Sequence, residues 1–452
     1  MKLGIDVGST NTDAVLVSES GSLIGTAKHS TSADTLSGVY NCVKELLNVA
    51  QVQTSELKGV FIGTTHLLHA LVSNQDLANT ALLRIVKQDT LMEPVMDWPK
   101  SLKDKVKSVH YVSSSNDYKK ANKCRPKFPA GEYQTLKREI IESNIDSVCI
   151  VGTLSPLYEN EEIAMKRIIA SDFPDLPITT SHQLGTIGYI ERENTSLLNA
   201  ILAKVIRKTL NGLSQLFSDL DIECPYWLIQ NDGSVMDVQE AIAHPILTIG
   251  SGVANSLRGA SALSNYNECI VVDVGGSTID IGRLRDGRLE EVMVDSSLFG
   301  IRIHVAMPRS LSIPFHGDPQ KITRDIKDAI EQLQVQENNL PIVFVGGASP
   351  LFNETLFGKY TRFINPAGYA FCSAVGACYA TLSSQVDKVY WLHDQSKEDI
   401  IEEIKGELFS ELLMKGAKKE SIKIASVEEY PFDYLKGEVM RIRAKAISRL
   451  NI

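Results

Sequence analysis

The sequence predicts an α/β protein of two duplicated lobes that face each other, followed by a small α/β appendage at the C-terminus. Three observations carry this prediction. The motif DVGSTNTD at Asp6–Asp13 recurs without a gap as DVGGSTID at Asp273–Asp280. Strand-like runs alternate with helical stripes between and after the two copies, as α/β lobes require. The composition then changes character after residue 386.

The repeated motif predicts the same local structure in both lobes. Each copy follows an apolar run, Leu3–Val7 or Ile270–Val274, and precedes a second apolar run. A glycine-containing turn between such runs is typical of a strand, a tight turn and a strand. The copies lie much further apart than the roughly 20 to 50 residues of stacked repeat units. We therefore expect two lobes, and the alternative is two unrelated β-turns.

The intervening runs predict the other elements of the lobes. Leucine- and valine-rich stripes indicate core helices over 36–47 and 197–213. Apolar runs indicate strands at Val60–Gly63, Ala81–Val86, Ser147–Val151, Tyr226–Gln230 and Ile342–Val345. We expect the first lobe at 1–186, with an insertion near 87–135 where the sequence is charged and poorly periodic. We expect the second lobe at 187–386, and its last helix could return to the first lobe.

Residues 387–452 predict the small C-terminal α/β appendage. KEDIIEEIKGELFSELLMKGAKK indicates a charged amphipathic helix, SIKIASVEEYPFDYL a strand, and GEVMRIRAKAISRL a last helix. The alternative is a solvated face or a coiled arm.

Composition excludes several classes of function. The 452 residues include 55 acids and 46 bases, a net charge of −9, and no basic block that could follow a phosphate backbone. Seven scattered cysteines without a C-x-x-C pair indicate a reducing compartment. No signal-peptide core or run of about 18 apolar residues is present. We expect a soluble cytoplasmic protein that binds neither nucleic acid nor membrane, with Cys372 and Cys378 in a buried small-residue helix.

The two turns predict an anion site between the lobes. Consecutive N–H groups of such a turn point into one concavity, and nearby hydroxyls add donors. An aspartate at the end of the strand can hold a divalent cation through water. Asp6 and Asp273 are therefore the candidates for the metal of a bound triphosphate. The candidates for its phosphates are Gly8, Ser9, Thr10, Asn11, Gly275, Gly276, Ser277 and Thr278.

A third signal is VFVGGASP at Val343–Pro350, an apolar run that ends in Gly346 and Gly347. Glycines there permit close approach of a flat ligand such as adenine, although alone they indicate a strand-to-helix turn. Together with the paired hairpins, this pattern resembles the actin, Hsp70 and sugar kinase superfold. The resemblance implies actin-like (ribonuclease H-like) lobes with an inter-lobe nucleotide cleft.

The segment Ile187–Arg288 resembles the core of the hydantoinase A and 5-oxoprolinase family. The matches are Glu191, Arg192, Thr195, Leu198, Asn199 and Ala200 with "ERTSTTVLNA", Gln230 and Gly233 with "QSNGG", Ser251 and Gly252 with "SGPAAG", and Asp273–Asp280 with "DMGGTSTD". Gly4–Asp13 is similar to "GIDVGGTFTD", and Gly63, Thr64, Thr65, Ala70 and Leu71 to "GTTVATNAL". The resemblance spans roughly residues 1–385.

The resemblance implies ATP and Mg as cofactors and a cyclic amide as substrate, since ATP cleavage in that family drives ring opening or the carboxylation of a ketone. An unstrained lactam resists hydrolysis, and phosphorylating its carbonyl oxygen creates a good leaving group. Alternatives are a small-molecule kinase of the same superfold and a non-enzymatic nucleotide-dependent switch. We interpret the chain as an ATP-dependent hydantoinase/oxoprolinase-like amidohydrolase subunit, and we keep the kinase and the switch as alternatives.

The sequence also departs from the family pattern. His69, Asp232 and Val253 stand where the family shows Asn, Asn and Pro, and the "GAGGGS" and "PGPACYGRGG" segments have no equivalent. These departures leave the substrate open. No hydantoinase B-like region is fused to the chain, so a hydantoinase B-like or other amidohydrolase partner subunit would supply any shared active site.

Four further residues are candidates for catalysis. Asp13 and Asp280 end the two repeats and either position metal or water or cap turn N–H groups. His69, with His66 one helical turn before it, either contacts substrate or is a surface or packed histidine. Arg192 either binds an anionic group of the substrate or pairs structurally with a carboxylate.

Overall fold

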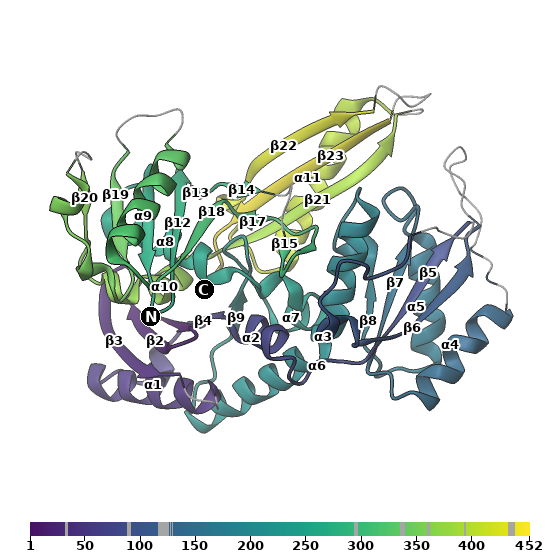
Figure 1. Ribbon diagram of the computed structural model, residues 1–452, viewed down its shortest axis with the longest axis horizontal. Helices are drawn as coiled ribbons and strands as arrows, with labels where there is room; N and C mark the ends of the chain where they lie inside the picture. The colour runs from purple at the N-terminus through teal and green to yellow at the C-terminus, as the bar shows by residue number, and fades with distance from the viewer. Residues whose placement is uncertain are drawn as a thin grey trace.

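The computed structural model describes residues 1–452 except 32–34, 88–91, 116–125, 127, 129, 293–296, 335–339, 359–361, 393–394 and 433–438. Much of the predicted insertion at 87–135, including Cys124, thus lies outside the described residues. Figure 1 shows two lobes on the left, an α/β insertion on the right, and the C-terminal strands above and between them.

The first lobe is built on a mixed sheet whose central strands follow the order β3-β2-β1-β4-β9-β10. These strands are β1 (Lys2–Val7), β2 (Asn11–Val17), β3 (Leu23–Ser30), β4 (Gly59–Thr64), β9 (Tyr226–Ile229) and β10 (Ser234–Met236). β1 and β2 form an antiparallel hairpin, and β1, β4 and β9 run parallel. Every residue of β4 is buried, as expected for a central strand covered on both faces.

The two core helices that the sequence predicts are present, and both pack on the first lobe. In α1 (Thr35–Ala50), Val39, Val43 and Leu46 are fully buried at helical spacing. The 31-residue α6 (Tyr189–Asp219) places its N-terminal half in the core of the insertion and its C-terminal end in that of the first lobe. It therefore joins the two parts along the lower side of the molecule (Figure 1).

The insertion is a four-stranded parallel sheet in the order β6-β5-β7-β8. In the sequence, the insertion falls between β4 and β9, which pair with each other in the first lobe. Its elements are β5 (Thr80–Val86), α3 (Lys100–Lys103), β6 (Val106–Ser113), α4 (Ala130–Glu142), β7 (Ser147–Gly152), α5 (Asn160–Asp172) and β8 (Ile178–Thr180). The insertion is thus larger than the sequence predicts, because the apolar runs assigned to the first lobe at β5 and β7 belong to this separate sheet.

The second lobe repeats the strand order of the first. β18, β12, β11, β19 and β20 lie side by side, with β11 and β12 as the antiparallel hairpin and β11, β19 and β20 parallel. The elements are β11 (Cys269–Val274), β12 (Thr278–Arg285), β13 (Arg288–Leu289), β18 (Ser310–Pro314), α9 (Pro319–Leu333), β19 (Ile342–Val345) and β20 (Phe363–Ile364). The predicted fold class of two duplicated actin-like lobes is confirmed.

Two helices cross between the lobes: α8 (Ser251–Ser264) and α10 (Cys372–Cys378). A Cβ at Gly259 would collide with the carbonyl of Cys372, and one at Gly376 with the carbonyl of Asn255. Glycine is therefore required for so close a crossing. Cys372 and Cys378 are buried in α10, which confirms their prediction, and α10 also packs on β1, β2 and β4.

The C-terminal segment extends the first lobe's sheet. β21 (Thr381–Trp391) pairs with β10 and β23 (Val439–Ser448), and β22 (Lys423–Pro431) pairs with β23 at the sheet edge. α11 (Lys397–Met414) packs on β21 and β23. The predicted last helix is wrong, because Ile442, Ala444 and Ala446 are buried at alternate positions, which is the period of a strand.

The sheets also divide the chain differently from the predicted boundary at residue 186. β9 and β10 return to the first lobe after the insertion, and the second lobe's own sheet begins at β11. Sequence periodicity could not show this return, because the pairing of β4 with β9 spans more than a hundred residues.

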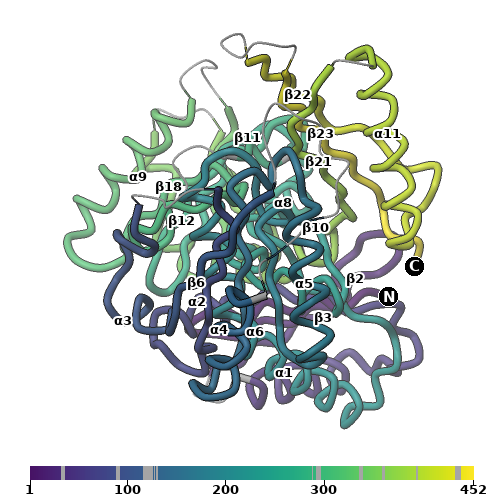
Figure 2. The backbone as a smooth tube through the Cα atoms, turned by 90° about the vertical axis from the view of Figure 1, so that its right-hand side faces the viewer, coloured from purple at the N-terminus to yellow at the C-terminus, as the bar shows by residue number. Residues whose placement is uncertain are grey.

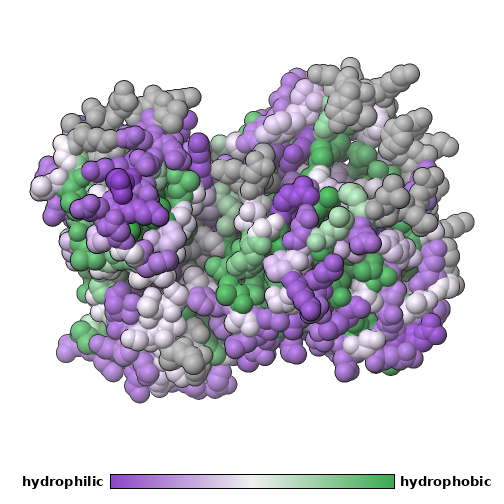
Figure 3. Space-filling view, in the orientation of Figure 1, coloured by the Kyte–Doolittle hydropathy of each residue, from purple (hydrophilic) through white to green (hydrophobic). Residues whose placement is uncertain are grey.

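The two chain termini lie close together in both backbone views (Figures 1 and 2). On the face of Figure 1, apolar patches near the centre are surrounded by polar surface (Figure 3). Within the part of the chain that the structure describes, no helix is both long and apolar enough to span a membrane.

Candidate functional site

The two hairpins have the same register and the same turn. Asp6 faces Asp13 across β1 and β2, and Asp273 faces Asp280 across β11 and β12. Gly8 N–H donates to the carbonyl of Asn11 at 3.0 Å, and Gly275 N–H to that of Thr278 at 2.9 Å. The duplication seen in the sequence is therefore a duplication of backbone geometry.

The hairpin turns meet across the lobes. A Cβ at Gly276 would lie 2.8 Å from Thr10 Oγ1, so a side chain there would collide with the opposite turn. Ser9 and Thr10 of one turn, and Gly276, Ser277 and Thr278 of the other, are exposed. The predicted phosphate-binding residues thus lie on accessible turns that face each other.

A glycine lies beside each inner aspartate on the next parallel strand. Gly63 is opposite Asp6 in register, and a Cβ there would lie 2.9 Å from Asp6 Oδ1. Gly346 follows the strand that pairs with Asp273, has φ +88°, and would collide with Asp273 Oδ1 if it carried a Cβ. In both lobes the glycine therefore leaves a cradle that the side chain of the inner aspartate occupies, together with the Asn255 amide beside Gly63. Gly347 is exposed, and contact of Gly346 and Gly347 with adenine stays a prediction.

Burial disfavours the ionised form of both inner carboxylates. Burial raises the pKa of Asp6 to about 8, with further contributions from the charges of Asp13 and Asp273. Burial likewise raises the pKa of Asp273 to about 6, although a hydrogen bond from Ser256 opposes the shift. A bound cation would lower the free energy of these ionised carboxylates.

Lys28 is a cation whose charge acts on the aspartates of both hairpins. It lies opposite Asp13 in the register of β2 and β3, and its Nζ contacts Asp13 Oδ1 at 2.7 Å. Sequence reasoning missed Lys28, since its pairing depends on the register of a third strand. Asp13 therefore has a lysine partner, and Asp280 is partly buried beside Ser312. The predicted roles of Asp13 and Asp280 toward metal, water or turn N–H groups stay predictions.

The first half of α8 presents polar side chains to the inner aspartates. Ser256 Oγ donates to Asp273 Oδ2 and contacts Ser373 of α10 at 2.8 Å. The Asn255 side chain is fully buried beside Gly63, and both of its amide atoms lack a hydrogen-bond partner in the described structure. Burying an unpaired amide costs roughly 1 to 3 kcal/mol, so such a group indicates a ligand or water.

These observations fit a hydrated divalent cation and a polyphosphate. The cradles at Gly63 and Gly346, the elevated carboxylate pKa values and the unpaired Asn255 amide surround the same end of the two sheets. Among the described residues, no group of three His, Cys, Asp or Glu side chains is placed to hold a metal directly. Mg²⁺ commonly keeps several of its waters, and Asp6, Asp273 and Asn255 would contact those waters.

The other predicted catalytic residues lie elsewhere. Arg192 is 1% exposed, and its guanidinium donates to Ser181 Oγ and to the carbonyls of Thr186 and Gly152. Its three nitrogens thus bond to a hydroxyl and two carbonyls within or beside the insertion, and none of these partners is a carboxylate. Binding of an anionic substrate group by Arg192 stays a prediction. His69 is exposed on α2 (His66–Ser73), and a contact of its side chain with substrate stays a prediction.

Two lobes of equal strand order, with paired glycine and aspartate hairpins between them, define a nucleotide-binding fold of the actin-like class. The sequence matches the model of the hydantoinase/oxoprolinase N-terminal region over residues 2–173. It matches the hydantoinase/oxoprolinase model over residues 192–311. The matches together cover well over half of the sequence, and the chain belongs to the hydantoinase/oxoprolinase family.

Two curated relatives are similar over part of the chain. Caprolactamase subunit alpha of Pseudomonas jessenii is 23% identical over 336 residues, which are 68% of this chain and 46% of the relative. The 5-oxoprolinase of Saccharomyces cerevisiae is 32% identical over 164 residues, which are 35% of this chain and 12% of the relative. The matches therefore span less than half the length of these relatives.

Two solved structures share the fold over the whole chain. The ATP-dependent caprolactamase from Pseudomonas jessenii has a TM-score of 0.79, and nucleotide-free acetone carboxylase one of 0.74. Each is 13% identical, and 88% of each of those chains is covered. At this identity the likeness shows the fold alone.

Proposed function

We propose that this chain is the ATP-using subunit of an ATP-dependent hydrolase that activates a cyclic amide for ring opening. The observation that carries the proposal is the pair of hairpins, which have equal register and equal turn hydrogen bonds and meet at Thr10 and Gly276. Such paired turns suit a polyphosphate held from both sides.

The residues of the two lobes would share the binding of Mg-ATP. The turn N–H groups and the hydroxyls of Ser9, Thr10 and Ser277 would bind phosphates, and Asp6 and Asp273 would accept hydrogen bonds from the metal's waters. When bound, ATP supplies the phosphoryl group that makes the amide oxygen a leaving group, and Mg²⁺ neutralises phosphate charge. Closure of the lobes would exclude bulk water from this cleft.

A lactam is the substrate class that the relatives support. The two curated relatives are named a caprolactamase subunit and a 5-oxoprolinase. The word subunit in the first name supports a partner chain for ring opening, for which a hydantoinase B-like or other amidohydrolase protein is the candidate. We therefore expect the isolated chain to have weak ATPase activity that increases when both partner and lactam are present.

The test measures phosphate release and ring opening with caprolactam, 5-oxoproline and hydantoin, for the chain alone and with its co-purified partners. Lactam-dependent phosphate release with stoichiometric ring opening supports the proposal. A stable phosphorylated product would identify a kinase instead. Slow hydrolysis that no lactam changes, with or without partners, would identify a nucleotide-dependent switch.

A further inference from the structure

A polar hollow of about 970 Å³ lies apart from the two hairpins. Its walls come from three parts of the molecule: the C-terminal strands, the second half of α8 with the nearby second lobe, and the N-terminal strand β1 with the turn after β2. None of the residues Gly8–Asn11 or Gly275–Thr278 lines it. The hollow is therefore a separate candidate site.

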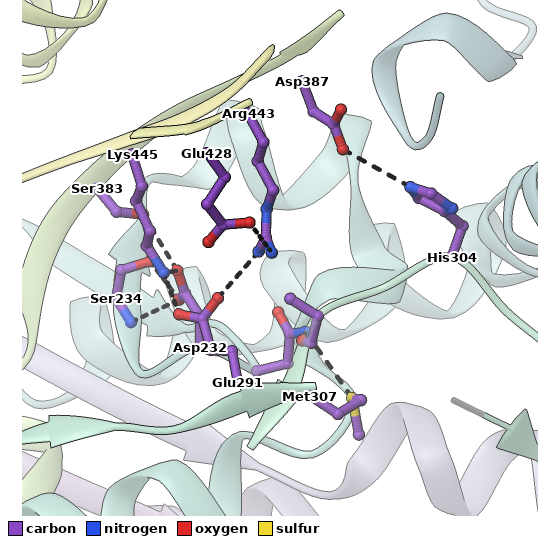
Figure 4. A network of polar contacts seen from close by, with 12 residues as sticks. Asp232, Ser234, Glu291, His304, Met307, Ser383, Asp387, Glu428, Arg443 and Lys445 are labelled. Carbon is purple, nitrogen blue, oxygen red and sulfur yellow. Dashed lines mark hydrogen bonds and ion pairs between the residues drawn. The ribbon is translucent and has the colours of Figure 1, made fainter. Parts of the chain in front are cut away.

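A network of ion pairs forms one wall of the hollow, as Figure 4 shows. Lys445 of β23 contacts Asp232 at 2.8 Å and also pairs with Glu291. Arg443 of the same strand pairs with Glu291 at 3.3 Å and with Glu428 of β22 at 3.7 Å. Each of the three carboxylates of this wall thus has a cation partner, although they outnumber the two cations by one.

Asp232 is held firmly within this network. Its carboxylate also accepts hydrogen bonds from Ser234 N–H and Oγ and from Ser383 Oγ. The charge of Lys445 and these donors hold the pKa of Asp232 well below its usual range despite burial. Glu19, the remaining acidic side chain of the lining, pairs with Lys58.

Three cations of the lining have no acidic partner within the described part of the chain: Lys2, Arg258 and Arg449. Lys2 Nζ donates to the carbonyl of Cys378 at 3.1 Å, and Arg258 donates to that of Gly233. Arg449 is exposed. With Glu19 paired to Lys58 outside the lining, the lining has five cations against the three other carboxylates, a small excess of positive charge in a chain of net charge −9. Clustered cations without a counter-charge are unfavourable.

We propose that this hollow binds an acidic segment of a partner protein, with glutamate or aspartate carboxylates paired to Lys2, Arg258 and Arg449. Small-ligand pockets are mostly apolar and enclose their ligand. This hollow is only partly enclosed, and its lining mixes serine, asparagine and charged side chains with apolar ones, which suits an extended, hydrated chain. Charge complementarity of this kind selects partners and speeds their association.

The hollow lies where a bound segment would contact several parts of the molecule. Arg258 lies on α8 two residues after Ser256, which bonds Asp273, and Leu289 of the lining belongs to β13 of the second lobe. Lys2 and Asp232 belong to the sheet of the first lobe and its β9–β10 turn. An occupant would therefore contact both lobes and the C-terminal strands at once. The inference rests on the proposed function for the existence of a partner subunit.

The experiment uses the full chain and a fluorescein-labelled hexaglutamate peptide, with anisotropy measured in low and moderate salt. We expect saturable binding that weakens with salt. Arg449→Gln and Lys2→Gln should each weaken it by about three- to ten-fold, and Arg258→Gln should do the same where circular dichroism shows an intact fold. Lys44→Gln, which neutralises an exposed lysine on α1 outside the hollow, should leave the affinity unchanged.

Three results would overturn the inference. The first is that the wild-type chain shows no saturable binding of the peptide. The second is that the Arg449→Gln and Lys2→Gln variants bind the peptide as tightly as the wild-type chain does. The third is that citrate displaces the peptide at an equal concentration of carboxylate groups. The last result would assign the hollow to a small polycarboxylate. Calorimetry of Mg-ATP binding with the same samples separates this inference from the proposed function. If the chain binds the nucleotide but not the peptide, this inference is wrong and the proposed function is not contradicted.

Discussion

The two glycine-containing hairpins, β1–β2 and β11–β12, share one backbone geometry but differ in what surrounds their inner aspartates. Asp273 accepts a hydrogen bond from Ser256, which also contacts Ser373 where α8 and α10 cross. Asp6 lies beside the unpaired Asn255 amide, and no hydrogen bond opposes the effect of burial on its pKa. The second aspartate is therefore positioned by a hydrogen bond from the protein, whereas none is among the causes of the Asp6 pKa shift. We expect a bound ligand to supply that support to Asp6.

The largest expected effect comes from neutralising the aspartates. Asp6→Asn and Asp273→Asn should each weaken Mg-ATP binding by the ~1.5 to 3 kcal/mol of a charged hydrogen bond, about ten- to a hundred-fold. Magnesium should increase the affinity for ATP, and we call this increase the magnesium effect. We expect Asp6→Asn to lose more of it than Asp273→Asn, because Asp6 lacks a hydrogen bond like the one that Ser256 donates to Asp273. Calorimetry with ATP in magnesium and in EDTA measures both contributions.

Binding in EDTA serves as the control, since neither variant should lose affinity there. Equal losses of the magnesium effect in the two variants would contradict the difference between the hairpins. Unchanged affinity in both variants would remove these residues from the metal site altogether.

The turn glycines Gly8 and Gly275 test whether hairpins with the same backbone geometry contribute equally to ATP binding. A Cβ at Gly8 would lie 3.0 Å from the carbonyl of Asn11, and one at Gly275 3.1 Å from that of Thr278. Neither glycine is among those with positive φ, so strain of the backbone is not the reason for glycine there. Gly8→Ala and Gly275→Ala should each weaken ATP binding by about ten-fold, because the methyl group obstructs a phosphate.

Thermal melts with and without Mg-ATP measure this effect. We expect both alanine variants to lose most of the nucleotide-induced rise in Tm, with a small loss of Tm in its absence. The same decrease in Tm under both conditions would show that the glycines serve the turns alone.

Asn255 tests the ligand dependence of the first hairpin. Asn255→Ala should weaken Mg-ATP binding by about three- to ten-fold, the value of one hydrogen bond at up to about 1.5 kcal/mol. The chain without ligand should not become less stable, because the amide atoms that are removed have no partner. Urea unfolding without nucleotide and calorimetry with it check the two parts, and a destabilised apo chain with full affinity would contradict the prediction.

Much of the nucleotide site could be predicted because it depends on local sequence. The two motifs specify a strand, a turn and a strand without reference to the rest of the chain, and both formed in equal register. Gly346 was likewise found from the end of an apolar run. The roles of these residues toward nucleotide stay predictions.

What the sequence did not reveal depends on distant contacts. Asn255 and Ser256 reach the aspartates because α8 crosses α10 at glycines more than a hundred residues apart. Their signal was a small-residue helix directly after the "SGPAAG"-like turn, which alone does not distinguish packing from binding. The C-terminal strand β23 is a different case, because Arg441, Arg443 and Lys445 alternate with apolar residues, which is typical of a half-buried strand. The local pattern therefore favoured a strand, and the helix prediction missed it.

The smallest expected effect concerns the support of the second aspartate. Ser256→Ala removes the hydroxyl that bonds Asp273 and should make the second hairpin resemble the first. We expect a loss of about two- to three-fold in Mg-ATP affinity and a decrease of about 1 kcal/mol in the free energy of unfolding. Ser373→Ala is the matched control, because it removes a hydroxyl at the same crossing that contacts Ser256 rather than the carboxylate. If Ser373→Ala weakens nucleotide binding as much as Ser256→Ala does, the helix crossing rather than the Asp273 hydrogen bond distinguishes the two hairpins.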